Sequence, residues 1–128
     1  MQLFLLFLIL ECALSKSVNN CQTFKGLVVT IFHHAISVYF TWNFILGVTT
    51  PMQHLLLLGV TMVQWKILGR CILTAYHNRM CDAPDDEPFD NIHAKLMGSG
   101  GELKEYGLPL LTILLDIYLI QSGKRVLF

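Results

Sequence analysis

The segment LVVTIFHHAISVYFTWNFILGV occupies residues 27–48 and is strongly apolar. These 22 residues include no Asp, Glu, Lys or Arg. At about 1.5 Å per residue, a helix of this length covers roughly 30 Å, which is the thickness of the hydrocarbon core of a bilayer. The segment therefore predicts a transmembrane helix in the first half of the chain.

Two more apolar segments follow this helix. Residues 49–51 are Thr-Thr-Pro, which is typical of a turn, so residues 52–76 are expected to form a second, antiparallel helix. Only its first part is almost wholly apolar, so a full span requires Lys66 and Arg70 to reach the interface or to face other helices. Residues 108–121 predict a further short membrane helix.

The N-terminal residues 1–14 form either a retained first membrane helix or a signal peptide. The sequence Ala13-Leu14-Ser15 fits a small-residue cleavage site, but no basic residue precedes the apolar stretch and Glu11 interrupts its end. These two features favour retention. The sequence therefore predicts an all-α integral membrane bundle of three or four transmembrane helices, in a membrane that the sequence does not identify.

The composition supports this class of protein. The chain has 128 residues, of which 54% are hydrophobic and 14% charged, whereas about a quarter of an ordinary soluble domain is charged. Nine basic residues balance nine acidic ones, so there is no general attraction to nucleic acid. The expected partners are the lipid bilayer and other membrane helices, including those of a second copy of the chain.

Residues 77–107 are expected to form a water-facing acidic loop, because they hold seven of the nine acidic residues and only three basic ones. Carboxylates gathered in this way can bind calcium, but their spacing does not fit an EF-hand. A solvated loop is the favoured interpretation, and no metal or cofactor site is predicted.

The basic residues predict an orientation, because they favour the cytoplasmic side of a membrane. With four helices, residues 16–26 and 77–107 share one side and carry five Lys or Arg, whereas the other side carries Lys124 and Arg125. The count predicts cytoplasmic loops and external termini. Removal of a signal peptide would instead place residues 16–26 outside, against this count.

Five polar residues are candidates for a site inside the membrane: His33, His34, Lys66, Arg70 and Asp116. If the chain turns at residues 49–51, both histidines lie level with Lys66. His34 is then about 10 Å deep and Asp116 about 12 Å deep from the same side. These groups are expected to meet, since an unpaired charge at this depth costs at least about 2.5 kcal/mol.

Two functions are compatible with such a group. The favoured one is a structural ion pair, which gives the chain a structural or interaction role in a membrane and no enzymatic activity by default. The alternative is a small proton or ion transporter, a channel or a membrane enzyme that uses the Asp–Lys–His level.

The histidines do not form an obvious metal site. His33 and His34 point about 100° apart on a helix, so only one of them can face Asp116, and they are poor joint ligands. His54 is expected near the opposite interface, with a hydrogen bond to a neighbouring helix or a lipid headgroup.

The four cysteines form no C-x-x-C motif, which argues against a redox motif and a zinc ribbon. A bond between Cys12 and Cys21 requires an oxidising lumen, and one between Cys71 and Cys81 contradicts a cytoplasmic loop. Free or palmitoylated thiols at Cys71 and Cys81 are equally compatible with the sequence.

A further pattern combines the His33-His34 pair with His54, Trp65, Arg70-Cys71-Ile72-Leu73-Thr74 and Asn78-Arg79-Met80-Cys81. It resembles a family of small multi-pass membrane proteins of uncharacterised function, some of which are encoded by large DNA viruses. The resemblance covers about residues 30–81. It implies a compact four-helix membrane protein and carries no established activity with it.

Overall fold

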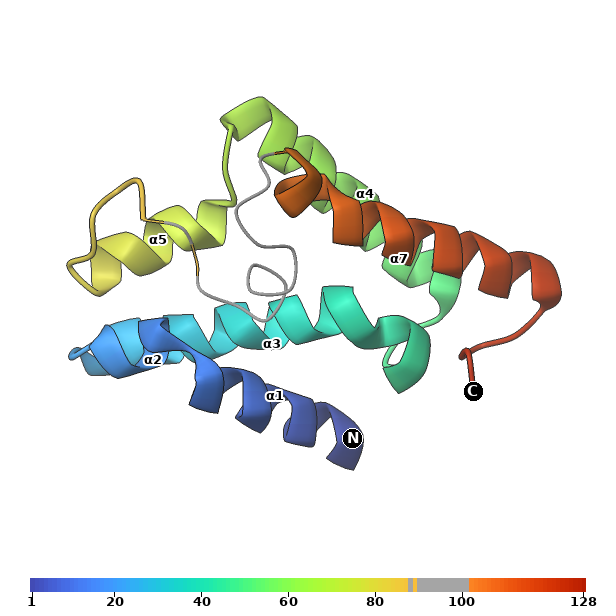
Figure 1. The fold of residues 1–128 in the computed structure, drawn as a ribbon, viewed down its shortest axis with the longest axis horizontal. Coiled ribbons are helices and arrows are strands. Elements are labelled where there is room, and N and C mark those ends of the chain that lie inside the picture. Colours follow the sequence, from blue (N-terminus) through green and yellow to red (C-terminus); the bar gives the residue numbers. More distant parts are fainter. Residues whose placement is uncertain (88, 90–101) are drawn as a thin grey trace.

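The computed structural model describes residues 1–87, 89 and 102–128. Every regular element in these residues is an α-helix, so the all-α prediction is confirmed. In chain order the helices are α1 (Gln2–Leu14), α2 (Lys16–Asn20), α3 (Phe24–Leu46), α4 (Pro51–Leu68), α5 (Ile72–Met80) and α7 (Glu102–Ser122), as Figure 1 shows.

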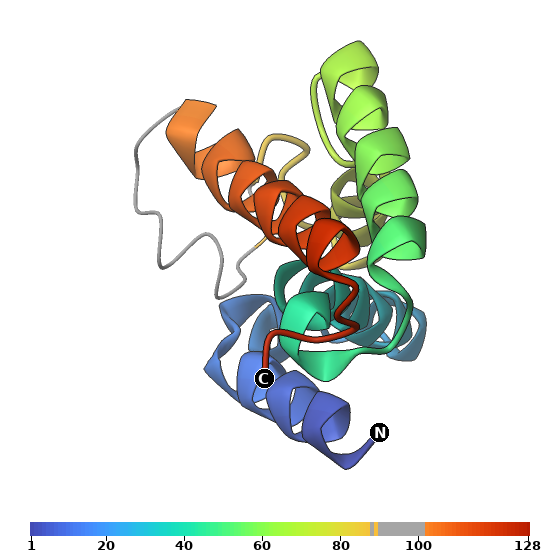
Figure 2. The ribbon, with the colours of Figure 1, turned by 90° about the vertical axis from the view of Figure 1, so that its right-hand side faces the viewer.

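Helix α3 lies in the middle of the molecule and contacts all the other helices described. The end-on view in Figure 2 shows α1 on one side of α3 and the pair α4 and α7 on the other. The side chain of Thr23 begins α3 by accepting a hydrogen bond from the Gly26 amide, and Gly47 ends it with a φ of 59°. The helix predicted at residues 27–48 is therefore confirmed, three residues earlier at its start and two at its end.

The single helix predicted for residues 52–76 is wrong. Helix α4 ends at Leu68, where Gly69 adopts a φ of 70°, and α5 begins at Ile72 with a bend of 68°. Glycine has no side chain to clash in this left-handed conformation, and it commonly ends a helix in this way. The apolar run thus becomes two helices joined at a break, which Figure 1 shows at the far end of α4.

The expected acidic loop is shorter than residues 77–107. Its first four residues belong to α5 and its last six to α7, which begins at Glu102 rather than at residue 108. Residue 88 and residues 90–101, the centre of that loop, lie outside the described residues.

Among the described residues, α3 is the one helix that is long and apolar enough to cross a membrane. Helices α4 and α5 are long and apolar enough only when the bent pair is taken together. Helix α1 and the Tyr106–Ser122 part of α7 are apolar but shorter. The described residues therefore contain one clear candidate span, and the bundle of three or four spans stays a prediction.

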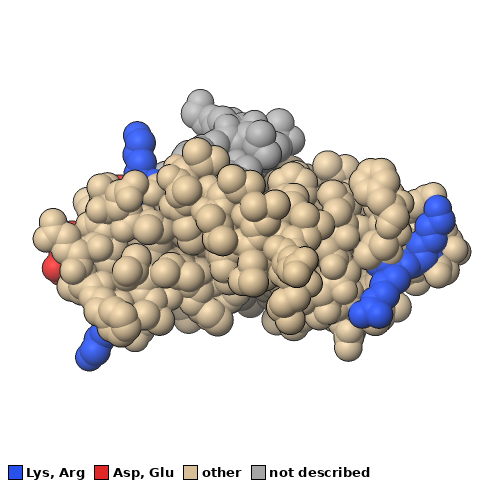
Figure 3. Space-filling view, turned by 90° about the horizontal axis from the view of Figure 1, so that it is seen from below, with Lys and Arg blue, Asp and Glu red and all other residues tan. Residues whose placement is uncertain are grey.

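The burial pattern is inverted relative to a water-soluble protein. Of the described residues, the buried hydrophobic ones are Cys21, Val38, Leu58, Phe89 and Leu119, whereas twelve polar or charged residues are buried. Large apolar side chains cover the outside of α1, α4 and α7, for example Ile67 at 75% exposure and Val60 at 71%. Figure 3 shows a broad uncharged belt on the face in view, with the charged side chains toward the two ends of the molecule.

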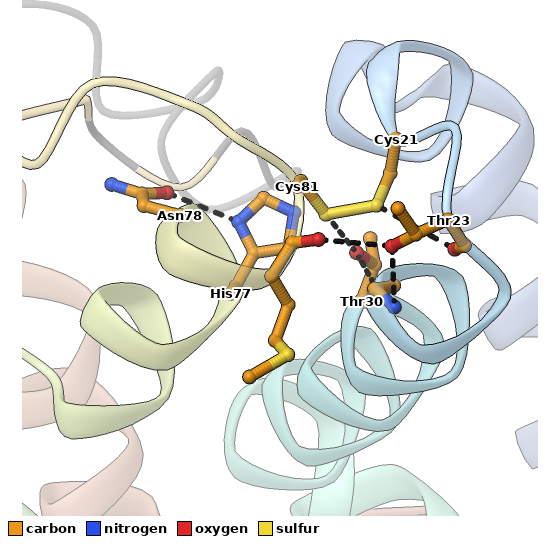
Figure 4. Close-up of a disulfide and its surroundings, with 8 residues drawn as sticks. Cys21, Thr23, Thr30, His77, Asn78 and Cys81 are labelled. Atoms are coloured by element: carbon orange, nitrogen blue, oxygen red, sulfur yellow. Dashed lines mark hydrogen bonds between the residues drawn. A yellow bond between two sulfur atoms is a disulfide. The ribbon is translucent and has the colours of Figure 1, made fainter.

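A disulfide between Cys21 and Cys81 ties the start of α3 to the end of α5 (Figure 4). Beside it, the Thr23 hydroxyl donates a hydrogen bond of 2.9 Å to the Met80 carbonyl. A Cβ atom at Gly26 would collide with both sulfur atoms, so this close approach requires glycine. Neither pairing considered from the sequence is present, and Cys81 is not a free thiol.

Candidate functional site

The first buried polar pair joins α4 to α7. His54 Nδ1 donates a hydrogen bond of 2.5 Å to Asp116 Oδ2, and both side chains are fully buried. The rings of Tyr39 and Phe40 on α3 lie against His54, with centroids at 5.1 Å and 5.9 Å. The hydrogen bond expected for His54 to a neighbouring helix is therefore confirmed. Its partner is Asp116, which was expected to meet His34 and Lys66 instead.

The second buried polar group joins α1 to α3. His34 Nδ1 lies 3.4 Å from Glu11 Oε1, and His34 Nε2 lies 2.9 Å from the Ser15 hydroxyl. A carboxylate only accepts hydrogen bonds, so Nδ1 carries the proton and Nε2 accepts from Ser15. All three residues are at most 2% exposed, and together they hold α1 against the central helix.

The expected meeting of Asp116 with His34 and Lys66 does not occur. The ion pairs among the described residues are His34 with Glu11 and His54 with Asp116, and Lys66 is exposed. Arg70 is also exposed and donates a hydrogen bond to the Asp85 carbonyl. Because α7 begins six residues earlier than predicted, Asp116 lies about 9 Å further along it, close to the start of α4.

The third feature is a cavity of about 270 Å³ beside the break between α4 and α5. Its walls come from α3, α4, α5 and the start of α7, so the break itself forms part of the lining. The apolar lining includes Phe40, Leu58, Leu73 and Leu108, and the polar lining includes His33, Gln64, Trp65 and Cys71. Cys71, which lies outside both helices at the break, is one of the lining residues.

His33 and Cys71 face each other in this cavity. The Cys71 sulfur lies 3.8 Å from His33 Nε2, and Cys71 is the residue that precedes the first turn of α5. His33 is 6% exposed, and its Nδ1 atom has no hydrogen-bond partner in the described part of the chain. The Trp65 indole N–H in the same cavity is also buried and unpaired. Buried polar atoms without partners are rare and need an explanation.

The His33 ring is held in place by Phe89. The two rings stack with centroids 3.6 Å apart and planes 19° apart, and His77 meets Phe89 edge-on at 5.4 Å. The His34 ring also contacts Phe89, with centroids 4.5 Å apart. The two histidines differ in their polar partners, since His33 faces Cys71 whereas His34 faces Glu11 and Ser15.

The chemistry of this cavity differs from that of the two acid–His pairs. The pairs are enclosed and mutually satisfied apart from one buried atom in His54 and one in Asp116, so they suit the joining of helices. The cavity combines a thiol, an imidazole and open volume, which together suit the binding of a ligand. The sequence marked His33 and Cys71 individually, but no linear pattern links residues 38 positions apart.

Comparison with known proteins adds no assignment, since no family model, no curated protein and no solved structure matches the chain. The resemblance to small multi-pass membrane proteins stays a prediction.

Proposed function

We propose that the chain is a multi-pass integral membrane protein that binds a small, mainly apolar ligand at the α4–α5 break. The inverted burial carries the membrane part of this proposal. In water, the apolar outside of α1, α4 and α7 would be an unusually large exposed patch. In lipid the same surface is solvated, and buried polar pairs are the expected means of joining helices.

In this arrangement the long axis of the molecule is the membrane normal. Helices α1, α3 and α7 and the bent pair α4–α5 each cross or enter the bilayer, which gives the three or four spans. The belt in Figure 3 supports this placement, because the charged side chains on that face lie beyond its two ends.

The disulfide favours the orientation opposite to the one predicted by the count of basic residues. Disulfides persist in oxidising compartments and are rare in the cytosol. The end of the molecule that holds Cys21 and Cys81 is therefore proposed to face the non-cytoplasmic side, with the C-terminus in the cytoplasm. A covalent bond outweighs a difference of three basic residues, five against two.

We expect protein isolated from cells without reductant, treated with hydroxylamine to remove any thioester and then denatured, to react with maleimide at two thiols, Cys12 and Cys71, and at four after reduction. A tag inserted in residues 98–101 should be accessible from outside the cytoplasm, and a tag after Phe128 should not. Four reactive thiols before reduction, together with a cytoplasmic loop tag, would contradict the orientation.

The cavity supports a ligand that arrives from the lipid. Ile72 lines the cavity and is 58% exposed, so it lies at the rim. Ile67 and Leu68 at the end of α4 are also exposed and apolar, and the exposed Lys66 and Arg70 lie in the same stretch. In this proposal the rim therefore opens where the apolar surface meets the basic residues of the interface. Inside, His33 and the Trp65 N–H supply the few polar atoms that orient a ligand in an otherwise apolar pocket.

Filling the cavity should abolish ligand binding. We expect Leu73→Trp to reduce labelling by a diazirine-bearing fatty acid in membranes by at least about ten-fold, because the indole occupies much of a 270 Å³ space. The matched control is Leu114→Trp, which is 63% exposed on α7 and is not among the lining residues. Equal labelling of the wild type and both variants would overturn the ligand-binding proposal.

A purely structural role is the second candidate, and the two acid–His pairs favour it because each joins two different helices. Such a role needs the pairs and does not need the cavity. Leu73→Trp should then leave assembly in the membrane unchanged, whereas loss of either pair should impair it.

A further inference from the structure

We infer that Cys71 is an acyl-accepting nucleophile, that His33 is its general base, and that the cavity between them receives the acyl chain of a long-chain acyl thioester. The inference rests on the ligand-binding proposal and names the class of ligand and the reaction. It is carried by the 3.8 Å approach of thiol and imidazole inside the cavity and by the unpaired Nδ1 atom of the buried His33.

The surroundings of Cys71 favour its reactive form. The nucleophile of a cysteine is the thiolate, which is stabilised at a helix N-terminus and beside a histidine. Cys71 has both neighbours, because it precedes the nine-residue helix α5 and faces His33 Nε2. The amides of Thr74 and Ala75 donate to the Cys71 carbonyl. The amides of Ile72 and Leu73, in the first turn of α5, are the donors available to an oxyanion that forms at this position.

The surroundings of His33 keep its ring neutral and fixed, with Nε2 facing the thiol, because the ring is buried and has His34 and His77 as neighbours. When Nε2 takes the thiol proton, the ring becomes a cation whose face lies against the Phe89 ring at 3.6 Å. A cation over an aromatic face is attracted by the ring quadrupole, more strongly when water is excluded. Phe89 thus orients the imidazole, which is one of the tasks that a carboxylate performs in other nucleophile–histidine pairs.

The reaction balances without an oxidant or a reductant. The Cys71 sulfur attacks the carbonyl carbon of the thioester and forms a new carbon–sulfur bond, and the original carbon–sulfur bond breaks. The thiol proton passes to His33 Nε2 and then to the departing thiolate, which leaves as a free thiol. The product is an S-acylated Cys71 whose chain lies among Phe40, Leu58 and Leu73.

The chain contains its own control for this reaction. Cys12 is the other free cysteine, is similarly half-buried, and has no imidazole hydrogen bond among the described residues. Purified full-length protein in detergent micelles is incubated with alkyne-tagged palmitoyl-coenzyme A, and hydroxylamine-sensitive label is quantified.

We expect wild type and Cys12→Ser to be labelled equally and Cys71→Ser to lose at least about nine-tenths of the label. His33→Gln should slow labelling by about 10²-fold, at the low end of general-base contributions. Its rate should rise steeply with pH, because without a base only pre-formed thiolate reacts. Phe89→Leu should slow the reaction less and shift the pH profile in the same direction.

Two results would overturn the inference. One is labelling of Cys71→Ser equal to that of the wild type, and the other is a His33→Gln rate and pH profile equal to those of the wild type. As a control for folding, the free thiols of each unreduced variant are counted with maleimide. Two free thiols, or one in the cysteine variants, show that the disulfide has formed. If photolabelling by the fatty acid persists while acylation is unaffected by these changes, the binding proposal stands and the inference fails. If Leu73→Trp leaves photolabelling unchanged, the binding proposal fails first.

Discussion

Asp116→Ala is expected to destabilise the protein by about 3–5 kcal/mol, the range observed when one partner of a buried ion pair is removed. His54 is fully buried, and its ring would be left with no acceptor for the Nδ1 proton. The contact joins α4 to α7, so the two helices should separate more readily. Thermal or SDS-induced unfolding of the purified protein in bicelles measures the change.

The comparison variants separate the charge from the packing. Asp116→Asn keeps an acceptor oxygen and should cost less stability than Asp116→Ala. The double change His54→Leu with Asp116→Leu should recover most of the lost stability, because apolar replacement of a whole buried pair is often neutral. Leu114→Ala, on the exposed face of α7, should change stability little. If Asp116→Ala were no worse than Leu114→Ala, the pair would not hold these helices together.

The sequence predicted α3 well because the physical signal is local. An uncharged segment of membrane length and a Thr-Thr-Pro turn after it are both signals that lie within or next to the helix. The break after α4 was missed although Gly69 was visible, because the apolar run continues past it and a helix through Lys66 and Arg70 completed a span. A count of residues that reaches the length of a membrane span does not reveal a bend within the segment.

The candidate site was predicted in its residue types and not in its partners. His33, His34 and Asp116 are all buried, as expected for polar groups that need pairing inside a membrane. Their partners depend on where α7 begins and how it crosses α4. The start of α7 was predicted six residues too late, so Asp116 was expected near His34, whereas it pairs with His54. The depth of Asp116 is counted from the first residue of α7, and the sequence does not fix that residue.

Glu11 and the disulfide show a second limit. Glu11 was interpreted only as an interruption of an apolar stretch, since its partner His34 is 23 residues away on another helix. Four cysteines allow three complete pairings, and the correct bond spans 60 residues. The Gly26 that makes room for it has no distinguishing neighbour in the sequence.

Glu11→Ala is the second change expected to have a large effect, again about 3–5 kcal/mol. It leaves His34, which is fully buried, with Ser15 as its remaining partner and removes the charged contact between α1 and α3. Glu11→Gln keeps an acceptor oxygen in the same place and should cost less. The measurement is unfolding of the purified protein, together with its steady-state level in cells.

The same variant tests whether α1 belongs to the folded protein. Leu10→Ala changes the neighbouring residue on α1, which is 50% exposed, and should have little effect on stability, so it is the matched control. If residues 1–14 were removed as a signal peptide, Glu11→Ala and Leu10→Ala would give mature proteins of identical mass and stability. A large difference between them, with residue 11 present in the mass spectrum, is the outcome that the buried contact with His34 requires, because a helix removed during maturation stabilises nothing afterwards.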